Sequence, residues 1–446
     1  MDTLLLALWR ELALFAGVGF LLFGLDDLLV DLIWLSFGPK DRTLDRKAKR
    51  PSDGDATYSY GIAIFVPAWD ESAVIGAMIN CCTQHWAGQE YRIYIGAYAN
   101  DPETIMAVQG HVNDQVRLVV NPRHGPTTKA DCLNAIWAQF KRDTQESPRP
   151  WGIVLHDAED VVHKQELRLY RALLPRHSMV QVPVLPLPDP RSPWVAGHYI
   201  DEFSDAHGKE LIVRTLIGAS LPSAGVGCAI RADTLSTLAQ KSNAKPFDEG
   251  TLTEDYELGL RLSGMEQTGH FARFRDPENG SLIAVRAYFP NRLVTSVRQK
   301  TRWIIGIALA GWDRTGWTQK PAEIWMRWRD RRTILSAIVL LTGYLSLIAA
   351  LPLLYRNTMP VPDGPLSFLF ACNLLLLCWR LTMRAAMVKR EYGWVQAAHA
   401  VPRALVSSIL AIMASRRAFA QYLRMLKTGS LHWDKTRHEF PDQGAR

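Results

Sequence analysis

One long stretch without charged side chains limits what this chain can fold into. Residues 334–355 contain no Asp, Glu, Lys or Arg. A helix needs about 20 such residues to cross the hydrocarbon core of a bilayer, so we expect a membrane span here. Residues 366–387 have a shorter apolar core, with Arg380 and Arg384 placed to reach one interface. They predict a second span, joined to the first through a tight turn at 360–365.

The N-terminal segment is a third candidate span, although it contains acids. Residues 12–37 are mainly apolar but include Asp26, Asp27 and Asp31. We interpret them as a membrane anchor, because a secretory signal would show an early basic region and a small-residue cleavage site. Carboxylates are costly inside a bilayer, so these three should face a partner helix or a polar cavity. Alternatively, the span lies near residues 3–25 and the acids lie at the interface.

Basic residues lie beside the apolar segments. Lys and Arg number 51 against 44 Asp and Glu, which gives a formal net charge of +7, and clusters occur at 40–50, 326–332 and 380–390. This arrangement follows the positive-inside rule and not the stripe of a nucleic-acid-binding protein, so we expect no nucleic-acid partner. It places the residues between the first two clusters in the cytoplasm. A fourth apolar stretch, 401–415, predicts an amphipathic interfacial or re-entrant helix, with a fourth span as the alternative.

Between the membrane segments, the pattern alternates between strands and helices. Apolar runs predict strands at 61–67, 92–97, 116–120 and 151–155, and helical patterns occur at 73–86, 127–141 and 164–174. The alternation predicts an α/β domain with a mostly parallel sheet. Ligands bind at the carboxyl ends of strands in such sheets. Polar or acidic clusters follow three of the predicted strands, at 68–71, 100–101 and 157–160.

The stretch LHDAEDVVH, residues 155–163, ends one predicted strand with three acids and flanking histidines. Because no glycine-rich phosphate loop follows the first strand, nucleotide phosphates need another counter-charge. Carboxylates supply one by binding Mg²⁺ or Mn²⁺, which prefer oxygen ligands. A solvated acidic loop is one alternative. A zinc site is another, but strand alternation points His156 away from Asp157.

Acidic and basic motifs continue downstream, in TLTEDYEL (251–258) and SVRQKTRWIIG (296–306). Together with the earlier acids, they resemble the motifs D, D-x-D, T-E-D and Q-x-x-R-W of the family 2 glycosyltransferases. The match is closer to the membrane-bound processive branch, which includes cellulose and hyaluronan synthases. The matching residues are Asp101, Asp157 with Glu159, Thr253–Glu254–Asp255, and Gln299 with Arg302 and Trp303. The resemblance covers about residues 60–310 and the membrane hairpin.

Longer phrases resemble the phage adsorption protein B group of bacterial inner-membrane glycosyltransferases. They are GPTTKADCLN (125–134), DAED (157–160), PSAGVGCAIR (222–231), LTEDYELGLRL (252–262) and WDKTRHEFP (433–441). One departure concerns the metal motif, because the usual D-x-D is D-A-E-D here. Either Glu159 or Asp160 is therefore the second metal ligand beside Asp157.

The resemblance implies a GT-A-type nucleotide-sugar-binding domain and a metal-dependent, inverting hexosyl transfer from a UDP-sugar. The implied donor-binding residues are Pro67, Glu71, Asp101, Lys129, Gln299, Arg302 and Trp303. Asp255 is implied as the catalytic base, with Glu254 beside it, and Gly225 and Gly227 form a loop that the sugar or acceptor approaches. The alternatives are helix capping by Asp70, Glu71, Asp101 or Glu254, a surface position for Lys129, membrane anchoring by Arg302 and Trp303, and a plain turn at 223–227.

The predicted organisation has five parts. They are an anchor (1–38), a basic linker (39–60), a GT-A domain (61–320), a juxtamembrane segment with a membrane hairpin (321–390), and an interfacial or re-entrant helix with a cytoplasmic tail (391–446). The resemblance implies a bacterial inner-membrane enzyme with a cytoplasmic catalytic domain. It would extend a surface polysaccharide, with an outer-membrane export partner. Single-sugar transfer to a polyprenyl phosphate lipid and a non-enzymatic membrane receptor or scaffold component are the alternatives.

Overall fold

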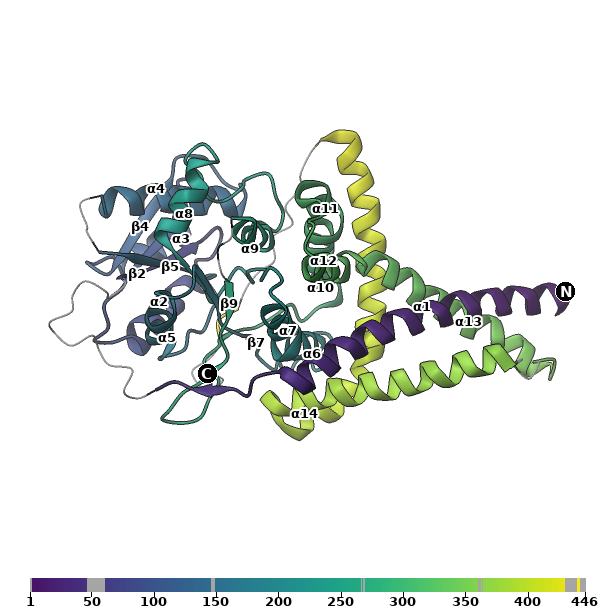
Figure 1. The fold of residues 1–446 in the computed structure, drawn as a ribbon. Coiled ribbons are helices and arrows are strands. Elements are labelled where there is room, and N and C mark those ends of the chain that lie inside the picture. The colour runs from purple at the N-terminus through teal and green to yellow at the C-terminus, as the bar shows by residue number, and fades with distance from the viewer. Residues whose placement is uncertain are drawn as a thin grey trace. The chain divides into compact units, whose positions relative to one another are not determined.

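The computed structural model describes residues 2–45, 61–145, 149–265, 267, 269–359, 362, 364–429 and 439–441. The chain divides into two compact units that interleave along the sequence (Figure 1). The sheet unit comprises residues 39–188, 217–289 and 431–446, and the helical unit comprises residues 1–38, 189–216 and 290–430. Most of the predicted basic linker, residues 46–60, lies outside the described residues.

A seven-stranded sheet forms the centre of the sheet unit, in the order β4-β3-β2-β5-β8-β6-β9. The strands are β2 (Gly61–Pro67), β3 (Arg92–Tyr98), β4 (Val116–Asn121), β5 (Trp151–Leu155), β6 (Met179–Gln181), β8 (Cys228–Arg231) and β9 (Gly269–Phe271). Neighbours run parallel except at β8, which is antiparallel to β5 and β6. The predicted α/β class with a mostly parallel sheet is confirmed.

Helices cover both faces of this sheet. They are α2 (Ile75–His85), α3 (Pro102–Gln109), α4 (Lys129–Asp143), α5 (Glu166–Leu173), α8 (Ala232–Gln240) and α9 (Glu254–Gly264). Phe140 of α4 packs against Phe65 and Tyr94 on one face. On the opposite face, Gly152 lies against Leu174, directly after α5, where a Cβ atom at Gly152 would be 2.4 Å from the leucine side chain. Cover on both faces explains the continuous apolar run of β2.

Two short strand pairs complete the sheet unit. β1 (Arg42–Thr43) pairs with β10 (Phe274–Arg275), and β7 (Val184–Pro186) pairs with β11 (Val285–Ala287). Both pairs are parallel. Their backbone hydrogen bonds join segments that are far apart in the sequence. No local sequence pattern predicts these pairs.

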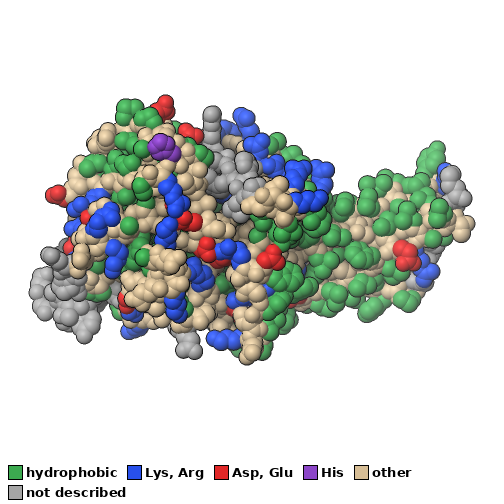
Figure 2. All heavy atoms as spheres, turned by 90° about the horizontal axis from the view of Figure 1, so that it is seen from above, with side chains coloured by type: hydrophobic (Ala, Val, Ile, Leu, Met, Phe, Trp, Pro, Cys, Tyr) green, Lys and Arg blue, Asp and Glu red, His purple; other side chains and the backbone are tan. Residues whose placement is uncertain are grey.

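The helical unit contains every candidate membrane span found among the described residues. Its elements are α1 (Asp2–Phe37), α6 (Gly197–Asp205), η2 (Ala206–Glu210), α7 (Leu211–Leu216), α10 (Leu293–Ile304), η3 (Ile305–Leu309), α11 (Ala310–Thr315), α12 (Pro321–Arg331), α13 (Thr333–Tyr355) and α14 (Gly364–Thr428). Three of these helices, α1, α13 and α14, are long and apolar enough to cross a membrane. Hydrophobic side chains cover the visible face of the long helices in Figure 2.

Helix α14 combines two segments that the sequence presents separately. The predicted span 366–387 and the predicted interfacial helix 401–415 both lie in this 65-residue element. A break at Gly393, with φ 80° and ψ −176°, divides it into two helices. Glycine adopts this conformation without the steric cost that a Cβ atom brings. The predicted tight turn at 360–365 lies partly outside the described residues.

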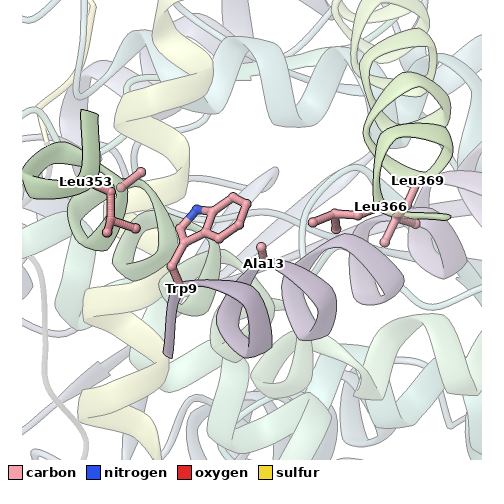
Figure 3. Close-up of a cluster of buried hydrophobic side chains, with 6 residues drawn as sticks. Trp9, Ala13, Leu353, Leu366 and Leu369 are labelled. Carbon is pink, nitrogen blue, oxygen red and sulfur yellow. The ribbon is translucent and has the colours of Figure 1, made fainter. Parts of the chain in front are cut away.

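Close apolar packing joins α1, α13 and the first part of α14. The buried cluster in Figure 3 consists of Trp9, Ala13, Ala350, Leu353, Leu366 and Leu369. Small residues bring the helices together, because a Cβ atom at Gly19 would lie 2.5 Å from the side chain of Val339. Gly17 approaches Leu369 in the same way, at 2.7 Å. Such small residues are typical of helix contacts within membranes.

The acids inside α1 face cationic and aromatic partners, as predicted. Asp26 and Asp27 pair with Arg329 and Arg332, which lie at the end of α12 and directly after it. Asp31 is buried, pairs with a lysine of η2 and accepts a hydrogen bond from Trp379 at 2.8 Å. Burying a carboxylate is costly unless it is paired, and each of these three is paired. They therefore fix α1 against the other helices of its unit.

A second buried charge cluster explains why residues 189–216 belong to the helical unit and not to the predicted GT-A domain. Asp201 on α6 has a fully buried side chain. It pairs with Arg403 at 2.7 Å and with Arg384 at 2.9 Å, both from α14. Arg384 is therefore held by a carboxylate, where the sequence predicted that it reaches a membrane interface.

Removing the charge of Asp201 should destabilise the helical unit strongly. Asp201→Ala leaves two guanidinium groups without their carboxylate, and breaking a buried pair costs about 3–5 kcal/mol. Asp205→Ala, on the same helix, is the matched control. Asp205 is 42% exposed, and its buried partner Lys209 keeps a second carboxylate, Asp31, so this variant should lose less stability. Thermal unfolding of the detergent-solubilised protein measures both, and equal losses would contradict this explanation.

Candidate active site

The carboxyl ends of three parallel strands bring the predicted functional loops to one edge of the sheet. Pro67, at the end of β2, lies beside Gly96 of β3. The Ala68 N–H donates to the Gly96 carbonyl at 2.8 Å, and the His156 N–H donates to the Phe65 carbonyl at 3.1 Å. The polar loops after β2, β3 and β5 are therefore neighbours, as the sheet rule predicted.

Lys129 places a positive charge at this edge of the sheet. It opens α4, and its Nζ atom lies 2.6 Å from Oδ1 of Asp157 and 3.3 Å from the Gly225 carbonyl. Burial alone lowers the pKa of Lys129, but the carboxylates of Asp157, Glu254 and Asp255 outweigh it and raise the pKa above its usual value. The side chain is only 19% exposed, which rules out the surface-lysine interpretation.

Asp255 and Gly225 approach each other closely. Asp255 lies in the first turn of α9, where its Oδ1 accepts a hydrogen bond from the Tyr256 N–H at 2.7 Å. Gly225 has φ +76°, and a Cβ atom there would lie 2.5 Å from Oδ2 of Asp255. Glu254 is buried beside it. The loop before β8 therefore needs glycine here for both its conformation and its contact with the acid.

Gln181 holds this loop, and the sequence analysis did not identify it. The side chain is fully buried at the end of β6. Its Nε2 atom donates to the carbonyls of Val226 at 2.8 Å and Gly227 at 3.1 Å, and its Oε1 accepts from the Ala224 N–H at 2.9 Å. Gly227, with φ +59°, packs against Val285. The sequence shows Gln181 only as a single amide at the end of an apolar strand, which does not indicate this role.

Asp101 performs the capping role that was its alternative interpretation. Its carboxylate accepts hydrogen bonds from the Thr104 N–H at 3.3 Å, at the start of α3, and from the Asp70 N–H at 2.6 Å. It thereby fixes the turn after β2, where Asp70 has φ 55°. Glu71 is buried, and its N–H donates to Thr104. The Glu71 carbonyl accepts hydrogen bonds from the Val74 and Ile75 N–H groups at the start of α2.

In the D-A-E-D loop, the three acids occupy different environments. The side chain of Asp157 is 34% exposed and meets Lys129. Glu159 is buried at 9% exposure. Asp160 is 2% exposed and is bound through Oδ2 by the His156 side chain at 2.8 Å and by the Asp157 N–H at 3.0 Å.

The structure gives no support to the zinc alternative. His156 is fully buried between Asp160 and a second carboxylate, and His163 contacts Ser281. Among the described residues, no group of three or more His, Cys, Asp and Glu side chains is arranged to hold a metal ion. A cation bound here would take part of its ligands from outside the protein. That suits Mg²⁺ or Mn²⁺ on a diphosphate, which use one or two carboxylates plus phosphate oxygens.

The Q-x-x-R-W residues lie in the helical unit. Gln299, Arg302 and Trp303 are all on α10. Trp303 packs against the rings of Tyr199 and Phe203 on α6, with centroid distances of 6.2 and 6.4 Å. This packing holds Trp303 against α6 within the helical unit. That Gln299, Arg302 and Trp303 contact the donor stays a prediction from the sequence.

A mostly parallel sheet with a lysine and carboxylates at its carboxyl edge defines a GT-A-like fold of the kind that nucleotide-sugar transferases use. Residues 152–383 match the model of the glycosyl transferase family group 2, and the chain belongs to this family. Two curated relatives are the bacteriophage adsorption protein B of Escherichia coli (strain K12) and the bacteriophage N4 adsorption protein B of Escherichia coli O157:H7. Each is 34% identical over 97% of this chain, which spans 62% of the length of each relative.

A solved structure shares the fold. It is the mannosyltransferase PcManGT from Pyrobaculum calidifontis, in complex with GDP-Man and Mn²⁺. The two chains are 16% identical, with a TM-score of 0.52, and the match covers 89% of this chain and 98% of that one. The GT-A-like fold expected from the sequence is confirmed.

Gly225→Ala should impair transfer through its contact with Asp255. The added methyl group would collide with the carboxylate, 2.5 Å away, and displace it. Gly218→Ala is the matched control, because Gly218 has a similar φ of +71° and no atom within 4 Å of its added methyl group. Both variants pay about 1 kcal/mol for the left-handed conformation. Turnover should fall at least tenfold only in Gly225→Ala, and equal turnover in the two variants would contradict the assignment.

Proposed function

We propose that this protein transfers a hexosyl group from a UDP-sugar to an acceptor hydroxyl, with inversion at the sugar carbon. The observation that carries the proposal is the set of contacts around Lys129. Its ammonium group lies 2.6 Å from the Asp157 carboxylate and 3.3 Å from the Gly225 carbonyl, and Gly225 in turn lies against the Asp255 carboxylate. A cation beside acids from two distant segments, at the carboxyl edge of a GT-A-like sheet, suits a substrate that brings both phosphate charge and a proton to remove.

The residues fit a divalent cation. An ammonium group contacts Asp157 at 2.6 Å, so this carboxylate is already placed to meet positive charge. Glu159 and Asp157 form an all-oxygen donor set, which Mg²⁺ and Mn²⁺ prefer. Asp160 is less suited because His156 and the loop backbone bind its carboxylate. When bound, such a cation neutralises charge on the departing diphosphate.

Donor binding is assigned to the loops after β2 and β3 and to the start of α4. Pro67 and Glu71 lie at the mouth after β2, next to the turn that Asp101 fixes. Lys129 would bind the diphosphate. A bound cation would partly neutralise the carboxylates near its ammonium group, so that this group can also bind phosphate oxygens. Gly225 brings the loop before β8 against Asp255, and the sugar or acceptor is proposed to approach this loop of Gly225 and Gly227. Gln299, Arg302 and Trp303 are proposed donor contacts on the strength of the sequence motif.

Asp255 is the proposed base. The acceptor hydroxyl oxygen forms a bond to the anomeric carbon while the bond from that carbon to the diphosphate oxygen breaks, and UDP departs. The hydroxyl proton passes to the Asp255 carboxylate. The Tyr256 N–H holds Oδ1 of Asp255, which fixes the orientation of the acid. Glu254 adds negative charge beside it.

We place the protein in a bacterial inner membrane, with the sheet unit in the cytoplasm. Three helices have the length and composition of membrane spans, and the adjoining clusters of basic residues favour a cytoplasmic side. The proposed acceptor is a growing surface polysaccharide. An outer-membrane partner would export the product. The names of the two relatives refer to bacteriophage adsorption, which fits a product at the cell surface. A polyprenyl phosphate lipid as acceptor is the second candidate.

Asp255→Asn tests the catalytic assignment. The asparagine keeps an oxygen for the Tyr256 N–H but cannot accept the proton. General-base catalysis is worth about 10²–10⁴-fold, so UDP release from the preferred UDP-sugar should fall by that factor while UDP affinity stays within twofold. Wild-type turnover in Asp255→Asn would show that another group takes the proton.

Removal of divalent cations should stop the reaction. Treating the purified protein with EDTA should abolish UDP release, and added Mn²⁺ or Mg²⁺ should restore it. Comparing the two ions identifies the better cofactor. Full activity in EDTA would exclude the proposed metal site.

A membrane receptor or scaffold component would bind no UDP-sugar under any of these conditions. The mass of the product distinguishes a polymer from a single sugar on a lipid.

A further inference from the structure

A buried ionic network lies beneath the D-A-E-D loop. The side chains of His156 and Glu166 are fully buried, and Asp160 is 2% exposed. His156 Nδ1 lies 2.8 Å from Oδ2 of Asp160, and its Nε2 lies 2.9 Å from Oε1 of Glu166. The imidazole ring therefore bridges two buried carboxyl groups, one at each ring nitrogen.

Each carboxylate of the network also binds the backbone of the loop. Oδ2 of Asp160 accepts the Asp157 N–H at 3.0 Å, and the Asp160 N–H donates to the Asp157 carbonyl at 3.2 Å. At the other end, Oε2 of Glu166 accepts the His163 N–H at 3.2 Å. One histidine ring therefore connects the turn that bears Asp157 to His163, which ends the loop.

Helix α2 and strand β11 hold the same loop from outside. His85 contacts the Val162 carbonyl through Nδ1 at 2.7 Å, and the Trp86 indole N–H donates to the His163 carbonyl at 3.1 Å. Val161 exchanges two backbone hydrogen bonds with Arg286 of β11, at 2.7 and 3.1 Å. These contacts fix the backbone of residues 161–163, which follow the acids of the loop.

Stability alone does not account for this network. It buries three polar side chains, and well-packed apolar side chains at such positions are often as stable or more stable. What apolar side chains cannot do is hold the Asp157 N–H and the His163 N–H at fixed positions. The network therefore serves the geometry of the loop.

We infer that His156 is a positioning residue that acts through Asp160 to fix Asp157 and Glu159 for divalent-cation binding. The inference rests on the proposed function, and it gives Asp160 a structural role, which leaves Glu159 as the second metal ligand. His156 touches neither donor nor acceptor in this account. Its effect reaches the cation through the Asp157 turn.

Binding of Mn²⁺ to the full-length protein in detergent tests this role. Electron paramagnetic resonance measures free Mn²⁺ as protein is titrated in the presence of UDP. We expect His156→Gln to raise the Mn²⁺ dissociation constant at least tenfold, because glutamine cannot bridge the two carboxyl groups. Asp157→Asn should remove measurable binding without loss of thermal stability. Thermal unfolding of each variant separates folding from binding.

Tyr170→Phe is the matched control within the network. The Tyr170 hydroxyl donates to Oε1 of Glu166 at 2.8 Å, so the variant removes a bond at the same carboxylate but none to the loop. Its Mn²⁺ affinity should stay within twofold of the wild type. If His156→Gln does not fold, the double variant His156→Gln/Glu166→Gln, which has one buried negative charge fewer, should fold and show the same tenfold loss.

Two results would overturn the inference in distinguishable ways. A folded His156→Gln or double variant that binds Mn²⁺ within twofold of the wild type would make the network purely structural. Wild-type protein that binds no Mn²⁺ with UDP would instead refute the metal site of the proposed function, and the positioning role would fall with it.

Discussion

The ion pair between Lys129 and Asp157 is the interaction on which the site depends. The ammonium group lies 2.6 Å from Asp157 and 3.3 Å from the carbonyl of Gly225, whose loop contacts Asp255 in the first turn of α9. The sheet makes the arrangement possible, because parallel strands deliver the start of α4 and the loop after β5 to a common edge. The antiparallel β8 brings in the loop of Gly225, and α9 brings in Asp255.

The helical unit solves a related electrostatic problem in apolar surroundings. Its acids, Asp26, Asp27, Asp31 and Asp201, are all paired with arginine or lysine side chains. These pairs join α1 to α12 and η2, and α6 to α14. Apolar packing with close contacts at Gly17 and Gly19 holds α1 against α13 and α14. Buried ion pairs and close apolar packing therefore act at different places along the same helices.

The parts of the fold that the sequence predicted are those with local signals. Strands β2 to β5 are mainly apolar runs followed by polar residues, and α13 is an uncharged stretch of span length. The membership of residues 189–216 in the helical unit was missed, because it depends on Asp201 meeting Arg384 and Arg403, far away in the sequence. The same holds for β7 and β11, whose pairing has no local pattern.

The residues of the candidate site likewise divide into those that the sequence predicted and those that it did not. Lys129, Asp157 and Asp255 were identified because each belongs to a short motif with a known place in a family. Gln181 and Glu166 were missed, and His156 was weighed only as a zinc ligand, because their importance lies in buried hydrogen bonds to other segments. A single buried polar residue at a strand end is compatible with many roles until its partners are known.

Calorimetric titration of UDP into the detergent-solubilised protein, with and without Mn²⁺, tests the central claim most directly. The claim is that Lys129 and the acids around it form a cation-assisted diphosphate site. It predicts UDP binding that requires Mn²⁺ in the wild type and weakens at least tenfold in Lys129→Met. UDP binding of equal strength with and without the cation, unchanged in Lys129→Met, would contradict it.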